Sequence, residues 1–207
     1  MYIVTAKEMY EIDRFAIEEG GGMAGKLLME NAGSQVAHHI KEDYAIDQKI
    51  AIVIGGGNNG GDGFVIARYL VDTGFDVSLF QLVTDEKIKG DSAYHKQLWI
   101  NRSGVIEHVT EASQLQKRLR AFDIVVDAIL GIGVSGRIRE PIRNMIAVIN
   151  QLDIIRIAVD IPSGLPANDD EDVDIAVKAN RTFIIEAPKV SAFCEPTSKY
   201  YGGLGSN

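Results

Sequence analysis

Residues 49–74 read KIAIVIGGGNNGGDGFVIARYLVDTG, and this segment is the most informative part of the sequence about the fold. It begins with an apolar run rich in isoleucine and valine, which is typical of a buried strand. Six of the 21 glycines of the chain then lie between Gly55 and Gly63. The remaining residues have the length and composition of a helix. A strand, a glycine-rich loop and a helix in this order predict one strand–helix unit of a parallel sheet.

Apolar runs alternate with helical segments along the rest of the chain. The expected strands are Lys49–Ile54, Val77–Val83, Val105–Val109, Ile124–Leu130, Ile154–Asp160 and Thr182–Glu186. The expected helices between them cover residues 63–73, 91–101, 111–121 and 139–150. Alternation of this kind indicates a parallel sheet covered on both faces. We therefore expect an α/β fold, a Rossmann-like three-layer sandwich with a mostly parallel central sheet.

Two N-terminal helices are extra to this repeat. Thr5 and Glu8 form a T-x-x-E capping box, which predicts a helix over about residues 6–19. A second helix is expected from about Ala24 to Glu42. Its expected apolar face consists of Leu27, Leu28, Ala32, Val36 and Ile40. We expect the two helices to pack on the sheet or to form a dimer interface.

The composition excludes several classes of protein. The 207 residues are 46% hydrophobic and 24% charged, and we interpret residues 1–207 as a single globular domain. The net charge of −8 argues against binding to nucleic acids or anionic membranes. Cys194 is the single cysteine, and the N-terminus lacks the pattern of a signal peptide. No run approaches the roughly 18 apolar residues of a membrane span. A reducing, cytoplasmic location is therefore expected.

Ligands of a doubly wound sheet bind at the carboxyl ends of its strands, so function is expected in the loops that follow the strands. In the first loop, Gly55, Gly57 and Gly60 match the G-x-G-x-x-G pattern of dinucleotide-binding loops. The same loop carries two amides and the carboxylate of Asp62, where a diphosphate would prefer positive potential. We expect a loop that lets the backbone approach a polar ligand, rather than a turn that merely tolerates glycine.

Three later loops also carry polar residues. Asp127 lies near the end of a buried strand, where an unpaired carboxylate is costly. Residues 131–137 follow it, either as an anion-binding turn with Arg137 available to a phosphate or as a simple capped loop. Asp160 emerges where another strand ends, and an ordinary Asx or serine turn is the alternative. Lys189 is expected at the surface rather than in the cleft.

Three of these loops offer oxygen ligands for a cation. Asn59, Asp127 and Ser163 come from three loops on one expected edge of the sheet. Oxygen donors suit a hard cation rather than zinc, and a set with one carboxylate favours a weakly held monovalent ion. The chain has no Cys/His metal spacing, and its four histidines are expected to be structural or exposed.

Several motifs, in consistent order over residues 5–190, resemble the NAD(P)H-hydrate epimerases, the YjeF N-terminal domain family. The segments are GGGNNGGDGFVIARYL, VDAILGIGVSGRIREPI, VDIPSG and EAPKV, together with KLLMENAG at 26–33 and KGD at 89–91. The resemblance implies a Rossmann-like fold, commonly a homodimer. It also implies an isomerase that interconverts the R and S epimers of hydrated NADH and NADPH, which carry a hydroxyl on the reduced nicotinamide ring. A dehydratase then uses the S form, and we expect it on a separate chain.

The resemblance also implies roles for individual residues. The hydrated nucleotide would contact Asn58, Asn59, Gly60, Gly61, Asp62, Gly131, Ile132, Gly133, Val134, Ser135, Gly136, Arg137 and Asp160. A potassium ion would be held by Asn59, Asp127 and Ser163. We expect Asp160 to do acid–base work, because epimerisation requires proton movement, whether by ring opening or by loss and return of water.

Two other functions and two departures from the family remain open. The alternatives are a non-catalytic Rossmann-like binding or scaffolding module and an ordinary NAD-dependent oxidoreductase, which the double-asparagine loop disfavours. The C-terminal segment VSAFCEPTSKYYGGLGSN predicts a last strand that is missing or divergent. The segment LPANDDEDVD, at 165–174, predicts a local loop that differs from the family pattern.

Overall fold

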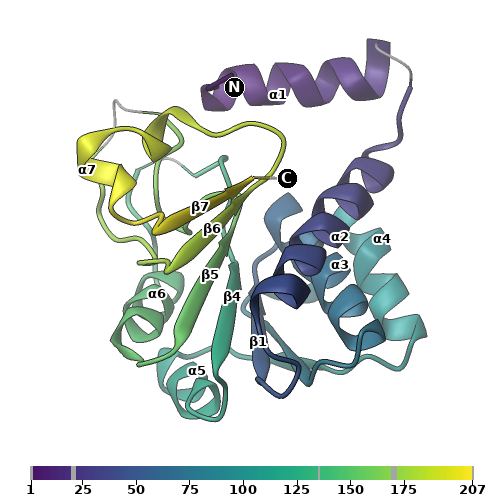
Figure 1. Ribbon diagram of the computed structural model, residues 1–207, viewed down its shortest axis with the longest axis vertical. Helices are drawn as coiled ribbons and strands as arrows, with labels where there is room; N and C mark the ends of the chain where they lie inside the picture. The colour runs from purple at the N-terminus through teal and green to yellow at the C-terminus, as the bar shows by residue number, and fades with distance from the viewer. Residues whose placement is uncertain (1, 20–21, 135, 169–171, 207) are drawn as a thin grey trace.

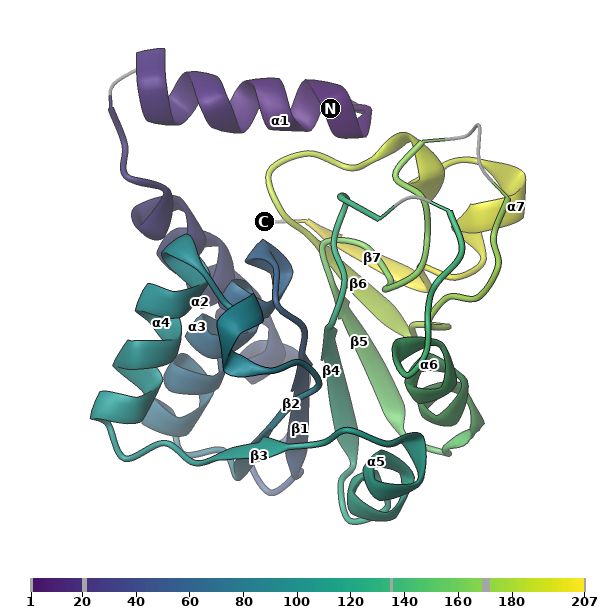
Figure 2. The same cartoon turned by 180° about the vertical axis from the view of Figure 1, so that it is seen from behind.

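The computed structural model describes residues 2–19, 22–134, 136–168 and 172–206. Within these residues, seven strands form one parallel sheet in the order β3-β2-β1-β4-β5-β6-β7 (Figures 1 and 2). The strands are β1 (Ile50–Ile54), β2 (Val77–Gln81), β3 (Ile106–His108), β4 (Ile124–Ala128), β5 (Ile155–Val159), β6 (Arg181–Ile184) and β7 (Gly203–Ser206). The chain winds outward in both directions from β1 and β4, so the order of strands reverses between these two. The predicted Rossmann-like fold is confirmed.

Helices cover both faces of the sheet. The long helices are α1 (Ala6–Arg14), α2 (Gly25–Asp43), α3 (Asn58–Asp72), α4 (Gly90–Asn101), α5 (Ala112–Leu119) and α6 (Ile142–Gln151). Shorter turns are η1 (Phe15–Glu19), η2 (Asp85–Lys87), η3 (Val190–Ala192) and α7 (Glu195–Ser198). In the described ranges no helix is long and apolar enough to cross a membrane.

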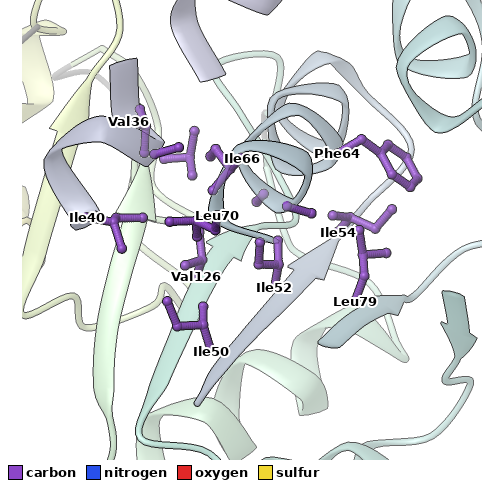
Figure 3. Close-up of a cluster of buried hydrophobic side chains, with 14 of the residues drawn as sticks. Val36, Ile40, Ile50, Ile52, Ile54, Phe64, Ile66, Leu70, Leu79 and Val126 are labelled. Carbon is purple, nitrogen blue, oxygen red and sulfur yellow. The ribbon is translucent and has the colours of Figure 1, made fainter. Parts of the chain in front are cut away.

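Strand β1 shows how the two faces are built. Ile50, Ile52 and Ile54 point to the face that α2, α3 and α4 cover, as Figure 3 shows for the cluster that they form with Val36 and Leu70. The residues between them point to the opposite face and pack against α5 and α6. All five residues of β1 are buried, which is the pattern expected of a strand covered on both sides. The register pairs Ile52 with Leu79 on one side and with Val126 on the other.

The second N-terminal helix forms as predicted, but its buried face is shifted. The buried residues are Met29, Gly33, Val36, Ala37 and Ile40, whereas Leu27 is 53% exposed. The reason is the crossing with α3: a Cβ atom on Gly33 would lie 2.5 Å from the Cβ of Val65. Only glycine permits this approach, so the line of contact passes through Gly33 rather than through the larger leucine.

The two ends of the chain test the predicted capping box and the predicted loss or divergence of the last strand. The capping box of α1 is present, because the Thr5 hydroxyl accepts from the Glu8 amide and the Glu8 carboxylate accepts from the Thr5 amide. At the C-terminus, the last strand is not missing: β7 pairs in parallel with β6. The departing segment 165–174 includes residues outside the described ranges, so its prediction stays open.

Candidate functional site

A cavity of about 500 Å³ lies at the carboxyl ends of the central strands. Its walls come from α1, α2, the start of α3 and the loops after β4, β5 and β6. Helix α1 crosses over this end of the sheet (Figures 1 and 2). Loops that are far apart in the sequence therefore meet at one place, as the topology of the sheet predicts.

The glycine-rich stretch is helical for more of its length than expected. Helix α3 begins at Asn58, five residues before the predicted start at Gly63, and only Gly55 to Gly57 remain as loop. The first turn packs back onto this loop, since a Cβ on Gly60 would lie 2.3 Å from the carbonyl oxygen of Gly55. A bulkier residue could not be placed there, which explains why the first turn of this helix contains glycine.

The start of α3 gives the cavity both backbone and side-chain polar groups. Asn58, Asn59 and Asp62 line the cavity, whereas Gly60 and Gly61 are buried and are not among its lining residues. The first amides of a helix lack partners within the helix and carry partial positive charge. The amides at Asn58 and Asn59 therefore suit an anionic group, whereas the Asp62 carboxylate further along the helix suits a positively charged one.

Only the first part of the loop after β4 lines the cavity. Residues 131–134 line it, together with Ile129 and Leu130. Gly136 and Arg137 are exposed and are not among its lining residues. Ser135 lies outside the described residues. The expected contact of Arg137 with a phosphate therefore stays a prediction without support from its position.

Two of the three expected cation ligands contact one backbone carbonyl, and the third, Asp127, contacts one of these two. Asn59 Nδ2 donates to the oxygen of Leu130 at 2.9 Å, and the Ser163 hydroxyl lies 3.1 Å from the same oxygen. The Ser163 hydroxyl and amide both donate to the carboxylate of Asp127. The buried Asn59 Oδ1 has no hydrogen-bond partner among the described residues.

This donor set fits a monovalent cation. It offers carbonyl, hydroxyl and carboxylate oxygens, and a buried amide oxygen, Asn59 Oδ1, that no described residue satisfies. Burial raises the pKa of Asp127 to about 6, and its hydrogen bonds from Ser163 oppose that rise. A buried carboxylate of this kind is more stable as an anion when a cation lies beside it.

Asp160 forms an ion pair with Lys189, and the prediction of a surface lysine is wrong. Lys189 is 1% exposed, and its Nζ donates to Asp160 Oδ1 and to the carbonyl of Ile185. The segment that carries Lys189 is held by the other end of the chain, because Val4 pairs with Lys189 in a short parallel bridge. Burial raises the pKa of Asp160, and the neighbouring Lys189 lowers it.

Asp160 also has an unusual backbone. Its φ is +66°, in the left-handed region that non-glycine residues rarely adopt. The Ile185 amide donates to Asp160 Oδ1 at 3.1 Å, so the side chain is held by the segment directly after β6, which also carries Lys189. Strained backbone of this kind persists where the surroundings fix it, often at functional sites.

Sequence reasoning missed a pair of acids in the same cavity. Asp13 of α1 and Glu186, two residues after β6, are hydrogen-bonded to each other through their carboxyl groups. Burial raises the pKa of both. One signal was available, because Asp13 lies four residues after the buried Met9 and so falls in the apolar stripe of α1.

Comparisons with known proteins place the chain in a family. Residues 25–191 match the family model described as "YjeF-related protein N-terminus". The chain is 35% identical to a bifunctional NAD(P)H-hydrate repair enzyme of Moorella thermoacetica, covering 99% of this chain and 39% of that protein. It is 37% identical to an NAD(P)H-hydrate epimerase of Rhodopirellula baltica, covering 90% of this chain and 75% of that protein.

The structural comparison agrees with these matches. The yeast protein YNL200c has a TM-score of 0.84 at 22% identity, covering 100% of this chain and 87% of that one. This likeness confirms the fold. The chain spans about two fifths of the bifunctional relatives and three quarters of the Rhodopirellula epimerase. On the family model and on these identities, the chain belongs to the YjeF-related N-terminal domain family.

Proposed function

We propose that this chain is an isomerase that interconverts the R and S epimers of hydrated NADH and NADPH. The observation that carries the proposal is the match to an NAD(P)H-hydrate epimerase over 90% of this chain and 75% of that protein. The cavity supports it, because it lies where a Rossmann-like sheet binds nucleotides and has carboxylates available for proton transfer. The proposal concerns this chain alone, whereas the bifunctional relatives are more than twice as long.

The two ends of the nucleotide would meet different surroundings. The start of α3 and residues 131–134 would contact the nucleotide, with its anionic part near the helix amides. The modified ring would lie toward Asp160, where the carboxyl groups gather. Asp160 would transfer protons at the ring, and Lys189 would hold its carboxylate in place. Gly60 and Gly61 would support the site by packing closely against Gly55 and Met29 rather than by contacting the nucleotide.

A potassium ion is the proposed companion of this site. Asn59, Asp127 and Ser163 would hold it, with the carbonyl of Leu130 as a further oxygen. When bound, the ion would supply positive charge that fixes the loop after β4 beside the cavity. The orphaned Asn59 Oδ1 is the observation that supports a cation at this position.

We also propose that the protein forms a homodimer and works with a dehydratase on a separate chain. The N-terminal segment supports the dimer, because eight of the sixteen exposed large hydrophobic side chains in the described residues lie between Tyr2 and Leu27. The relatives named as bifunctional repair enzymes support a link to a second repair activity.

The deciding experiment follows the conversion of one purified epimer of hydrated NADH into the other, by NMR or by HPLC. The protein should accelerate the conversion far above the rate without protein, with hydrated NADH and hydrated NADPH each tested. Asp160→Asn should abolish this acceleration while the protein stays folded, because the side-chain oxygen can still accept from Lys189 and from the Ile185 amide. A wild-type protein that gives no acceleration, in potassium buffer, would contradict the proposed function and would favour the non-catalytic binding module.

A further inference from the structure

The Asp13–Glu186 pair has no role in the function proposed above. Asp13 comes from the first helix and Glu186 from the loop after β6, so the pair joins opposite ends of the chain across the cavity. Two ionised carboxylates in contact repel each other, so a hydrogen bond between them requires one shared proton. One member of the pair is therefore a carboxylic acid and the other a carboxylate, so the pair can either give or accept a proton. Both members line the same cavity as Asp160.

The groups around the pair are mostly acidic. Lys189, Asp160 and Asp62 face it from the loop after β6, the end of β5 and the start of α3. Four carboxyl groups thus share this part of the cavity with one lysine. Such surroundings stabilise positive charge and favour the protonated form of the pair.

Asp62 gives independent evidence that this part of the cavity takes a ligand. It is 8% exposed and lines the cavity, and none of the described residues forms a hydrogen bond with its carboxylate. An unpaired buried carboxylate is costly, so its partner is expected to come from a bound molecule. A ligand that carries or develops positive charge is the type that it would stabilise.

The chemistry of the proposed substrate supplies such a charge. The hydroxyl of the hydrated ring is on a carbon next to the ring nitrogen. When this hydroxyl accepts a proton and leaves as water, the C–O bond breaks and its electron pair departs with the water. The electron pair of the nitrogen then forms a C=N bond, and the ring becomes an iminium cation. Water that adds to the opposite face gives up a proton and yields the other epimer, so nothing is oxidised or reduced.

Epimerisation by this route needs a proton donor on one face of the ring and a proton acceptor on the other. Ring opening would pass through a neutral intermediate and would gain little from four carboxyl groups. We propose that the Asp13–Glu186 pair is a second catalytic acid–base group, which exchanges a proton with water on one face of an iminium intermediate while Asp160 does so on the other. Between turnovers the group that gave up its proton regains one from solvent, and the group that accepted a proton releases it to solvent. This inference rests on the proposed function.

Isosteric amides test the pair. Glu186→Gln and Asp13→Asn each keep a hydrogen bond, because the amide donates to the remaining carboxylate, but they remove the shared proton. Each should lower kcat by about 100-fold or more, in the range of general acid–base catalysis, while KM and the thermal midpoint stay near wild type. The wild-type rate should fall as the pH rises and the pair loses its proton, and this alkaline fall should be absent from both variants.

The control is Glu11→Gln, which changes an exposed carboxylate on the same helix that pairs with Lys7 rather than lining the cavity. It should keep the wild-type rate. The route is tested separately by one turnover in heavy-oxygen water, where each converted molecule should carry a solvent oxygen.

The outcomes separate this inference from the proposed function. An inactive wild-type protein would contradict both the proposed function and the role of the pair. An active wild type whose two amide variants change only KM or stability would show that the pair merely holds α1 against the sheet. Retention of the original oxygen would overturn the iminium route in favour of ring opening.

Discussion

At the scale of single residues, Asp62 illustrates a conflict between stability and function. Its carboxylate is buried without a hydrogen bond from the described residues, and burial raises its pKa well above the usual value. The folded protein therefore binds this proton more tightly than the unfolded chain does. Its contribution to stability is complete in acid and is lost as the pH rises through the raised pKa.

Asp62→Asn should accordingly stabilise the protein in neutral and mildly alkaline solution. Asparagine does not titrate, so the variant avoids the cost of a buried unpaired charge, about 1–3 kcal/mol. The gain in unfolding free energy should be largest near pH 8 and should shrink toward pH 4, as denaturant titrations at several pH values would measure. A variant less stable than wild type near pH 8 would mean that the carboxylate has a stabilising partner.

The Asp160–Lys189 pair makes the opposite prediction. Lys189→Met leaves a buried carboxylate without its cation, and breaking a buried pair in this way costs about 3–5 kcal/mol. Asp160→Asn in the same protein should restore much of the loss, because no charge then remains and the Ile185 amide can still donate to the side chain. A double-mutant cycle measured by unfolding checks this coupling. Additive effects of the two substitutions would show that the pair is not energetically coupled.

Lys189 also shows a limit of sequence reasoning at this scale. The residues next to it in the sequence give no sign of Val4, which pairs with its backbone from the other end of the chain. Asp160 was predictable because a parallel sheet places the end of each strand at the same edge. A contact that depends on the path of an N-terminal extension carries no local signal, and the same holds for the pairing of Asp13 with Glu186.

At the scale of secondary structure, strands were more predictable than helix starts. All six expected strands are present, because buried parallel strands are continuous apolar runs. The start of α3 was misplaced because glycine disfavours helices by intrinsic propensity, whereas close packing against Gly55 requires glycine at this position. The seventh strand, β7, was missed because its sequence Gly203–Ser206 lacks the usual β-branched residues.

The crossing of α2 and α3 gives a prediction for these elements. Gly33→Ala should destabilise the protein by about 1–3 kcal/mol, although alanine favours helices, since its Cβ would lie 2.5 Å from the Cβ of Val65. A Cβ atom cannot rotate away, so the helices must separate. Thermal or denaturant unfolding measures the effect, and Gln35→Ala, at an exposed position of α2, is the matched control. A Gly33→Ala variant as stable as wild type would show that the crossing can widen freely.

At the scale of the whole molecule, the sequence predicted the architecture and the edge that holds the site. It predicted the convergence of Asn59, Asp127 and Ser163, because their loops follow neighbouring or central strands. It did not predict the wall that α1 adds to the cavity, since helix periodicity reveals which face is apolar and not what that face covers.

The proposed potassium site should connect ion binding to the stability of the whole fold. A cation that binds only the folded state stabilises it by about 2.7 kcal/mol at a hundredfold excess over its Kd. Potassium chloride should therefore raise the thermal midpoint by several degrees relative to sodium chloride at equal ionic strength. Asn59→Ala should remove this difference because it deletes the buried Oδ1, whereas Asn31→Ala, at an exposed position of α2, should keep it. Equal midpoints of the wild-type protein in the two salts would contradict the site.

The exposed apolar side chains of the N-terminal segment support the proposed homodimer. Tyr2, Phe15 and Leu27 are 89%, 57% and 53% exposed, and they belong to an N-terminal segment unusually rich in exposed hydrophobic side chains. Monomeric proteins rarely expose large apolar patches, so this segment is the expected interface. Phe15→Ser should shift the protein to a monomer in light scattering or sedimentation over a range of concentrations, while Val105→Ser, at an exposed residue just before β3, should leave it a dimer. A wild-type protein that is monomeric at every concentration would assign the exposed segment to a different partner.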